Sequence, residues 1–262
     1  MHQYLFFIGN FPIRLYGIFF SLGIISGCIT AYFLLKKDRR GWESHMFDLG
    51  LVIAFAGIVG GRLWDVFFFD WEYYHNHLLE IPYIWQGGMA IQGGIIFACI
   101  AAYFYLKKHQ IPVLPFADTV TPGIILGQAI GRIANFMNGD AFGHPTGQDF
   151  GLLYPDTTLA YHTYGAQPLW PAEVWECQGD LLIFVLLLWY RCKTRAEGTT
   201  FCLYIMFYSL LRFFLENYRG DYGTLALGLK SAQITSLAAF VGAFILFLYF
   251  HFKYKSKSGI SE

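Results

Sequence analysis

Charged residues are scarce in this sequence, and their scarcity excludes most soluble folds. Only 14% of the 262 residues are Asp, Glu, Lys or Arg, while 56% are hydrophobic and 20% are aromatic. A soluble globular domain carries about 25% charged residues. The mean hydropathy is +0.43. The composition therefore indicates a polytopic membrane protein.

Net charge, cysteine pairs and a signal peptide are also lacking. The 18 Lys and Arg balance the 18 Asp and Glu, so we expect no nucleic-acid partner. The five cysteines form no CxxC pair, which argues against a disulfide framework or a zinc site. We expect them to pack as small apolar residues within helices, with one reactive thiol as the alternative. The start "MHQYLFFIGNFPIRLYG" has no cationic region or cleavage site, so we expect the first helix to remain.

Long apolar runs are abundant instead. A transmembrane helix needs about 20 apolar residues. We expect seven such helices, at residues 14–35, 47–69, 88–106, 113–136, 172–190, 199–216 and 232–252. The sequence thus predicts an all-α fold with one integral-membrane domain over residues 1–262 and an outer loop at about 139–170. A loop longer than 15 residues is typically a binding element or a lid.

Most basic residues lie beside alternate helix ends. Twelve of the eighteen fall in clusters at 36–40, 107–108, 191–195 and 253–257. The positive-inside rule places all four clusters in the cytoplasm. With seven spans, the N-terminus is then outside and the C-terminus is cytoplasmic.

Six basic residues lie elsewhere, within helices or at their outer ends: Arg14, Arg62, Arg132, Arg212, Arg219 and Lys230. A charge inside the bilayer costs at least ~2.5–3.5 kcal/mol, so it is normally paired and often functional. Arginine binds phosphate through a planar fork, so an anionic phospholipid headgroup is the expected ligand. The alternative is that a side chain only snorkels to the interface. We favour snorkelling for Arg14 and Lys230.

Glycines recur every four residues in the fourth apolar run. Gly123, Gly127 and Gly131 share one helix face, where a neighbouring backbone can approach closely. Gly139 suits the end of this helix.

Polar residues follow that stripe in "GRIANFMNGDAFG". Arg132 points off the edge of the glycine face, and Asn135 and Asn138 make the stripe polar as the helix leaves the membrane. Asp140 and Gly143 then begin the outer loop. The spacing therefore predicts a polar stripe where this helix leaves the membrane.

The segment "YSLLRFFLENYRGD" carries a second constellation. Tyr208, Arg212 and Glu216 recur every four residues, and Arg219 follows three residues later. Glu216 can orient Arg212 and offset its charge. The alternative is a structural buried ion pair.

Three further features occur in the first three helices. In "GGMAIQGG", glycine pairs bracket Gln92, which can form hydrogen bonds but cannot act as a base. In the second helix, Arg62 and Asp65 are spaced to form an ion pair. In the first helix, Tyr16 fits the aromatic belt at the membrane interface.

Several blocks together resemble the prolipoprotein diacylglyceryl transferases of bacterial plasma membranes. The matching blocks are "LYG", "GGR", "GGMAIQGG", "GRIANFMNGDAFG" and "LLRFFLENYR". The resemblance implies a transferase that takes the diacylglyceryl group from phosphatidylglycerol. It attaches the group as a thioether to the lipobox cysteine of a prolipoprotein and releases glycerol phosphate. The active site would face the outer leaflet, with membrane lipids around the protein and no cofactor or metal.

The resemblance also implies roles for single residues. Arg132 would grip the lipid phosphate, and Arg212 would stabilise the leaving phosphate or help to activate the thiol. Glu216 would orient Arg212, and Gln92 occupies a catalytic position. The residues assigned to substrate binding are Arg132, Asn135, Asn138, Asp140, Gly143, Tyr16, Tyr208, Arg62, Arg219, Gly93 and Gly94.

The sequence departs from the family pattern at several positions. Gln92 stands where the family commonly has histidine. In "WPAEVWE", Trp170 stands where the family has histidine and Trp175 where it has tyrosine, while Pro171 and Glu176 match the family. Asp140 occupies a position where the family usually has glutamate, and Ala134 one where it usually has glycine. Two alternatives therefore stay open: a divergent paralogue with another acceptor or lipid, and a non-enzymatic protein that binds or translocates anionic lipid. A translocator needs a polar path through the whole bilayer, whereas most ionisable groups within the predicted helices cluster in its outer half, which disfavours this alternative.

Overall fold

The computed structural model describes residues 3–8, 11–193, 196–220 and 228–258. The chain forms two compact units, the first from residues 1–34 and 117–262 and the second from residues 35–116. The prediction of one integral-membrane domain is not tested by this division.

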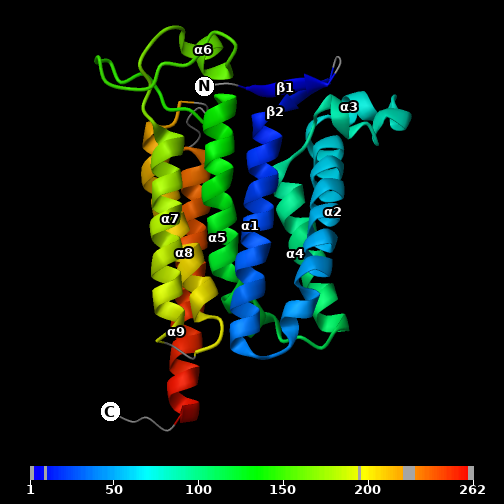
Figure 1. Cartoon of the computed structure of the whole chain (residues 1–262), viewed down its shortest axis with the longest axis vertical. Helices are drawn as coiled ribbons and strands as arrows, with labels where there is room; N and C mark the ends of the chain where they lie inside the picture. The colour runs from blue at the N-terminus through cyan, green and yellow to red at the C-terminus, as the bar shows by residue number, and fades with distance from the viewer. Residues whose placement is uncertain (1–2, 9–10, 194–195, 221–227, 259–262) are drawn as a thin grey trace. The chain divides into compact units, whose positions relative to one another are not determined.

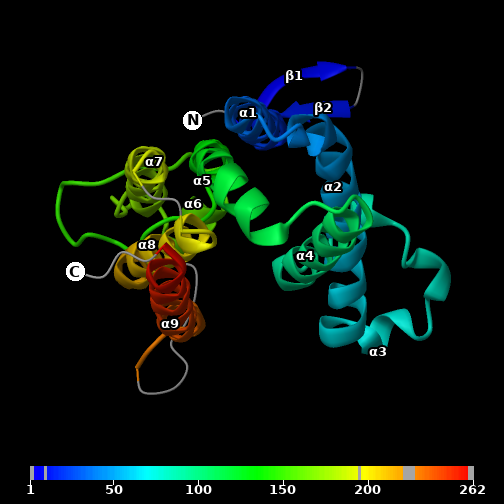
Figure 2. The same ribbon diagram turned by 90° about the horizontal axis from the view of Figure 1, so that it is seen from below.

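The first unit contains the segments with most of the candidate residues. Its elements are β1 (Tyr4–Ile8), β2 (Phe11–Arg14), most of α1 (Leu15–Asp38), most of α5 (Val113–Asn138), α6 (Leu159–Tyr164), α7 (Ala172–Arg191), α8 (Thr199–Leu215), a 3-10 turn (Glu216–Tyr218) and α9 (Ser231–Ser258). Helices α5, α7, α8 and α9 run side by side (Figures 1 and 2). Ile125 of α5 packs with Ile183 and Leu187 of α7, so these helices share a core.

The predicted glycine stripe brings α1 and α5 into close contact. A Cβ atom on Gly23 would lie 2.7 Å from the carbonyl oxygen of Gly127, and one on Gly27 would lie 2.7 Å from that of Gly123. Close approach is confirmed for Gly123 and Gly127. Gly131 has no neighbouring atom within 4 Å of its own Cβ position, although its backbone nitrogen would lie 3.6 Å from a Cβ atom on Gly23, so the contact loosens at this end of the stripe.

The second unit is built on a helix pair. Its elements are the end of α1, a 3-10 turn (Trp42–His45), α2 (Met46–Trp64), a π-helical turn (Asp65–Phe69), α3 (Trp71–Tyr74), 3-10 turns (Leu78–Glu80 and Ile84–Gln86), α4 (Ile91–Lys108) and the start of α5. Helices α2 and α4 lie side by side (Figures 1 and 2). The backbones meet at Gly60 and Gly93, where a Cβ atom on Gly93 would lie 2.2 Å from the carbonyl oxygen of Gly60.

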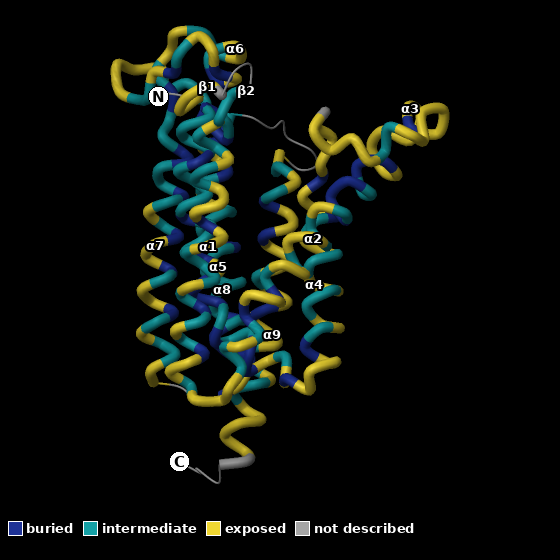
Figure 3. The backbone as a smooth tube through the Cα atoms, turned by 45° about the vertical axis from the view of Figure 1, so that its right-hand side comes forward, coloured by how far each residue is buried: buried dark blue, intermediate teal, exposed yellow. Residues whose placement is uncertain are grey.

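Helices occupy all seven predicted segments, but fewer meet the requirements of a span. Within the described residues, five segments are long and apolar enough to cross a membrane: Leu15–Asp38, Trp42–Phe69, Val113–Asn138, Thr199–Tyr218 and Ser231–Ser256. Helix α7 carries several charged side chains, which lower its hydropathy. Exposed residues run along the helices (Figure 3) and include large apolar ones such as Leu51 and Phe55. This surface suits a polytopic membrane protein.

The all-α prediction holds for the chain as a whole, and the segment before the first predicted helix adds a short hairpin. Strands β1 and β2 pair antiparallel, with Ile8 opposite Phe11. Aromatic and β-branched residues favour strands, and this run precedes the first helix. The outer loop also contains a short helix, α6, which is capped by the side chain of Thr158.

The outer loop has its own small core next to the end of α5. Phe142, Tyr154, Ala160 and Leu169 pack together. Gly139 follows the last residue of α5 with a φ of 71°, as expected for the end of a helix. The loop therefore folds over the end of α5 at which the predicted polar residues lie.

Candidate active site

Glu176 on α7 is the centre of a buried ionic cluster. Its carboxylate lies 3.0 Å from Nε of Arg132 on α5 and 3.4 Å from Nη1 of Arg219 after α8. It also forms an ion pair with Arg212 on α8. Three arginines from separate segments thus meet at one carboxylate.

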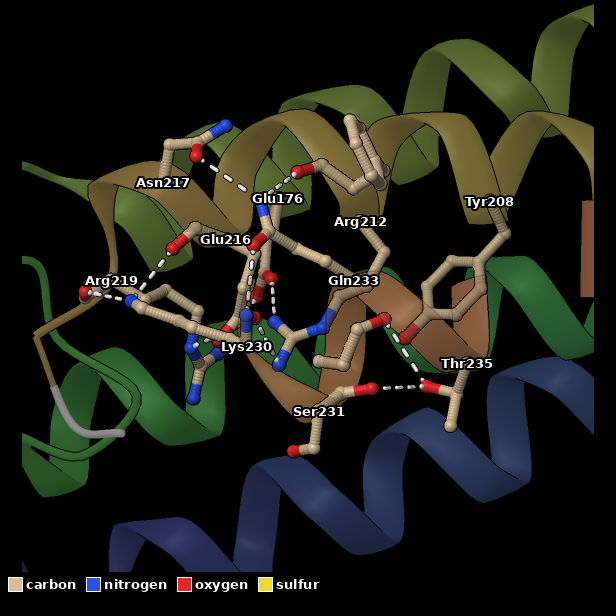
Figure 4. Close-up of polar contacts among 12 residues, drawn as sticks. Glu176, Tyr208, Arg212, Glu216, Asn217, Arg219, Lys230, Ser231, Gln233 and Thr235 are labelled. Atoms are coloured by element: carbon tan, nitrogen blue, oxygen red, sulfur yellow. Dashed lines mark hydrogen bonds and ion pairs between the residues drawn. The ribbon is translucent and has the colours of Figure 1, made fainter. Parts of the chain in front are cut away.

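A second carboxylate, in the 3-10 turn that follows α8, completes the cluster. Nη2 of Arg212 lies 2.9 Å from Oε2 of Glu216, which confirms the pair predicted from their spacing. Lys230 donates hydrogen bonds to the carbonyl oxygens of Glu216 (2.8 Å) and Arg219 (2.6 Å), and its Nζ lies 4.0 Å from Oε1 of Glu216. Figure 4 shows Arg212, Arg219 and Lys230 converging on the two glutamates. Lys230 thus has partners within the cluster, whereas its position in the sequence favours a side chain that snorkels to the membrane interface.

The cluster is held rigidly but is not sealed. The side chain of Glu216 is fully buried, while 18% of the Arg132 side chain and 15% of the Arg212 side chain remain exposed. Buried carboxylates fix the arginines in place, since leaving either partner unpaired would be costly. Because these two side chains are fixed and remain partly exposed, they are the candidates for binding an anion.

A polar clasp lies where α5 ends. Nδ2 of Asn135 donates to Oδ1 of Asp140 at 2.6 Å, and Nδ2 of Asn138 donates to Oδ2 at 2.7 Å. The side chain of Gln3 donates to the carbonyl oxygen of Asn138 at 3.1 Å. The predicted grouping of Asn135, Asn138 and Asp140 is confirmed, and Asp140 is fixed in orientation by both amides.

Two tyrosines border the arginine cluster. Nη2 of Arg132 lies 3.5 Å from the hydroxyl oxygen of Tyr208, to which it donates. Tyr16 on α1 interacts electrostatically with Asp140 and Arg132. The role of Tyr16 in substrate binding stays a prediction.

Gly143 joins the outer loop to the segment that carries Arg219. Gly143 pairs with Arg219 in an antiparallel β-bridge, and Gly220 N–H donates to the carbonyl oxygen of Phe142 at 3.0 Å. A Cβ atom on Gly143 would lie 2.2 Å from the carbonyl oxygen of Trp170. Gly143 is thus required by backbone packing, which favours a structural role over the predicted contact with substrate.

Comparisons with known proteins agree with this geometry. The family model described as prolipoprotein diacylglyceryl transferase matches residues 3–249. The chain belongs to this family. Three similar proteins are named phosphatidylglycerol--prolipoprotein diacylglyceryl transferase. That of Staphylococcus saprophyticus is 34% identical over 94% of this chain and 88% of the relative. That of Geobacillus kaustophilus is 36% identical over 92% of this chain and 89% of the relative. That of Clostridium botulinum strain Langeland is 34% identical over 95% of this chain and 96% of the relative.

Arg62, which the resemblance assigned to substrate binding, is in the second unit and is engaged by backbone. Its Nε donates to the carbonyl oxygen of Ile81 and its Nη1 to that of Gly87, both at 2.7 Å. Nη1 also lies 3.9 Å from Oδ2 of Asp65, in the predicted pair. The side chain is buried and its guanidinium faces the ring of Tyr74. This geometry favours a structural role, in which Arg62 holds the segment before α4 against the end of α2.

The remaining candidates of this transferase also lie in the second unit, at the start of α4. Gln92 is exposed in the first turn. Gly93 is buried against Gly60, and Gly94 faces Gly57, with 3.3 Å between its Cβ position and the Gly57 carbonyl oxygen. Both glycines therefore serve helix packing, and their contact with substrate stays a prediction. The substrate role of Gln92 stays a prediction.

The central role of α7 could not be derived from spacing along the chain. Glu173, Glu176 and Asp180 lie on one face of α7 and are all buried. Glu176 entered the sequence analysis only through the resemblance. Charged residues at i, i+3 and i+7 in an otherwise apolar helix were the signal that could have identified them.

Glu173 connects the cluster with the outer loop. The hydroxyl of Tyr154 donates a hydrogen bond to Oε1 of Glu173. Burial and the neighbouring Glu173 raise the pKa of the Tyr154 hydroxyl, so it stays a protonated donor. This bond ties the core of the outer loop to the first turn of α7.

The two tryptophans that depart from the family pattern form an aromatic cluster. The ring centroids of Trp170 and Trp175 lie 5.6 Å apart. The ring centroid of Tyr218 lies 5.3 Å from that of Trp170 and 5.2 Å from that of Trp175. Rings at these distances pack against one another. Trp175 directly precedes Glu176, and Tyr218 directly precedes Arg219. Aromatic packing is therefore adjacent in sequence to two residues of the ionic cluster.

No group of three or more His, Cys, Asp or Glu side chains among the described residues is arranged to hold a metal ion. The predicted chemistry relies on arginine, carboxylate and amide side chains.

Proposed function

We propose that this protein transfers the diacylglyceryl group of phosphatidylglycerol to the lipobox cysteine thiol of a prolipoprotein. Membership of the family and the names of the relatives support this activity. The observation that carries it is the position of Arg132 and Arg212, which are fixed by Glu176 and remain partly exposed.

The reaction needs little covalent chemistry from the protein. The cysteine thiol releases its proton to solvent, and the sulfur attacks the carbon of the diacylglyceryl group that is bonded to the phosphate oxygen, so a C–S bond forms and that C–O bond breaks. The electron pair of that bond stays on the phosphate, which leaves as glycerol phosphate. Nearby cations lower the pKa of a thiol and stabilise a departing anion.

Each part of the site has a role in this scheme. Arg132 binds the lipid phosphate, and Arg212 stabilises the charge that develops on the leaving group. Glu176 orients both arginines and Glu216 also orients Arg212, while Asn135 and Asn138 fix Asp140 at the end of α5. Oriented donors that need no rearrangement are worth most in a water-poor site.

The proposal includes a membrane arrangement. The protein crosses the bacterial plasma membrane seven times, with an outer N-terminus and a cytoplasmic C-terminus. Helices α4 and α7 then span together with the five long apolar segments. The basic clusters support this orientation, and it places the arginine cluster toward the outer leaflet.

A direct assay tests the activity. Purified protein in detergent is mixed with phosphatidylglycerol and a lipobox peptide, and mass spectrometry follows the diacylglyceryl adduct and glycerol phosphate. We expect both products, and neither with a peptide whose cysteine is replaced by serine. Absence of both from well-folded protein would instead favour another acceptor, another lipid or a binding role.

A further inference from the structure

A polar pair that the arginine cluster does not include lies one helical turn away from it. The hydroxyl of Tyr204 on α8 donates a hydrogen bond to Oε1 of Gln128 on α5 at 2.9 Å. Gln128 is one turn before Arg132 on α5, and Tyr204 is one turn before Tyr208 on α8, so the members of each pair share a helix face. Because Arg132 also contacts Tyr208, the Gln128–Tyr204 pair continues this polar contact along the same two helices.

The side-chain amide of Gln128 is only half engaged. Its oxygen accepts the hydrogen bond from Tyr204, whereas its nitrogen, which carries two N–H donors, donates to no group among the described residues. The residue is half-buried, so part of it remains accessible. The amide nitrogen is therefore a donor that has room for an acceptor from outside the protein.

A donor at this depth of the helix needs such an acceptor. Gln128 lies about 15 Å along the axis of α5 from its last residue, Asn138, at a rise of 1.5 Å per residue. In the proposed membrane arrangement, this position is inside the outer leaflet, where water is scarce. An amide without a partner in hydrocarbon is costly, and polar side chains within a span are usually functional for this reason.

A lipid ester supplies an acceptor of the right kind at the right depth. The ester carbonyl oxygens of a diacylglyceryl group accept hydrogen bonds, and they are joined to the phosphate through the glycerol carbons. They lie deeper in the leaflet than the phosphate does. Gln128 is displaced from Arg132 in the same direction by one helical turn, which rises about 5.4 Å. A lipid whose phosphate binds at Arg132 thus brings its ester groups to the level of Gln128.

We propose that Gln128 binds an ester carbonyl of the diacylglyceryl group and that Tyr204 orients its amide. This inference rests on the proposed function, because it places the phosphate of phosphatidylglycerol at Arg132. It narrows the substrate class to lipids with ester-linked chains, in preference to ether-linked chains of the same length and charge. Gln128 is a binding residue in this scheme, and Tyr204 is a positioning residue.

Ester and ether forms of phosphatidylglycerol test the subsite. Both have the same phosphate and the same reacting C–O bond, but the ether form lacks the carbonyl oxygens. Loss of one neutral hydrogen bond weakens binding by about 2- to 10-fold. With a lipobox peptide as acceptor, we expect the wild type to have a lower KM for the ester lipid by that factor.

Variants show whether this preference comes from the Gln128–Tyr204 pair. Gln128→Leu should lose most of the preference by raising the KM for the ester lipid, while the KM for the ether lipid stays the same. Tyr204→Phe should lose part of it, because the amide keeps its donors but loses its orienting partner. Tyr190→Phe, which removes a half-buried hydroxyl from α7, is the matched control and should keep the full preference.

A binding measurement makes the test independent of catalysis. Calorimetry in detergent compares dihexanoyl phosphatidylglycerol with its dihexyl ether analogue, without an acceptor peptide, for the wild type and the same variants. We expect the ratio of the two affinities to follow the ratio of the KM values. If Gln128→Leu does not fold, the ratio measured for Tyr204→Phe decides, and a ratio equal to that of the wild type would overturn the inference.

The other outcomes are equally decisive. Equal binding of both lipids by the wild type would overturn the inference, and so would an undiminished preference in folded Gln128→Leu. A raised KM for the lipobox peptide with an unchanged lipid preference would also overturn it, by assigning the amide to the peptide. A wild type that prefers the ester lipid in calorimetry but transfers no diacylglyceryl group would refute the proposed function and leave the ester subsite in place.

Discussion

Nε of Arg132 lies 3.0 Å from Oε2 of Glu176, although the two residues are on different helices, α5 and α7. The same carboxylate also holds Arg212 and Arg219. Glu176 therefore converts three arginines, which would repel one another, into a single fixed cluster. The proposed catalysis depends on this pre-organisation, because a flexible arginine would lose conformational entropy on binding phosphate.

Substitution of Arg212 should abolish most transfer and, because it leaves the buried Glu216 without this partner, also lower the Tm. Arg212→Ala removes a guanidinium from the expected position of the leaving phosphate, and loss of one such donor typically lowers kcat by about 100- to 1,000-fold. Arg212→Lys should recover little, because an ammonium lacks the planar fork that reaches Glu176 and Glu216 together. Single-turnover assays with a lipobox peptide measure the effect, with exposed Lys193→Ala as the control. Near-normal turnover of Arg212→Ala would refute its role.

Asp118 should fix the position of α8 from the end opposite the arginine cluster. Its Oδ2 accepts from Gly198 N–H at 2.6 Å and its Oδ1 from Phe201 N–H at 2.8 Å, so a residue of α5 caps the start of α8. Loss of a cap of this kind costs about 0.5–2 kcal/mol. Asp118→Ala should therefore lower the Tm and, by loosening α8, reduce transfer.

Asp118→Asn keeps one acceptor oxygen and should have a smaller effect on both measurements. Exposed Asp156→Ala serves as the control. A Tm of Asp118→Ala equal to that of the wild type would show that this cap does not hold α8. Both Tm and activity are measured in the same detergent, because detergent changes the stability of membrane helices.

Features confined to one helix could be predicted from the sequence, and features between helices could not. The Arg212–Glu216 pair and the end of α5 at Gly139 follow from local spacing and local backbone preference. The convergence on Glu176 requires knowledge of which helices are neighbours, which spacing does not provide. Arg62 shows the same limit, since its partner Asp65 was predicted but its bonds to distant carbonyl groups were not.

Two glycines of the predicted stripe should respond in opposite ways to alanine. A Cβ atom on Gly123 would lie 2.4 Å from the carbonyl oxygen of Gly27, so Gly123→Ala must push α1 away from α5. Overpacking of this kind typically costs about 1–3 kcal/mol. Gly131→Ala meets no atom within 4 Å and should be neutral or stabilise the helix by about 0.5–1 kcal/mol. Thermal unfolding of both variants tests this; equal losses of stability would contradict the close contact of α1 with α5.

Gln92→His should retain or raise transfer. Gln92 cannot accept a proton from the substrate thiol, whereas histidine titrates near neutral pH and can. The side chain is exposed at the first turn of α4, so an imidazole fits without displacing core residues. We expect a gain to appear mainly at low pH, where little thiolate forms spontaneously, and pH–rate profiles of both proteins with a lipobox peptide measure it. Gln92→Ala is the matched variant, since it removes the amide without adding a base. If Gln92→His and Gln92→Ala both lose most activity, the amide itself makes a hydrogen bond that the reaction requires, and the expectation for histidine is wrong.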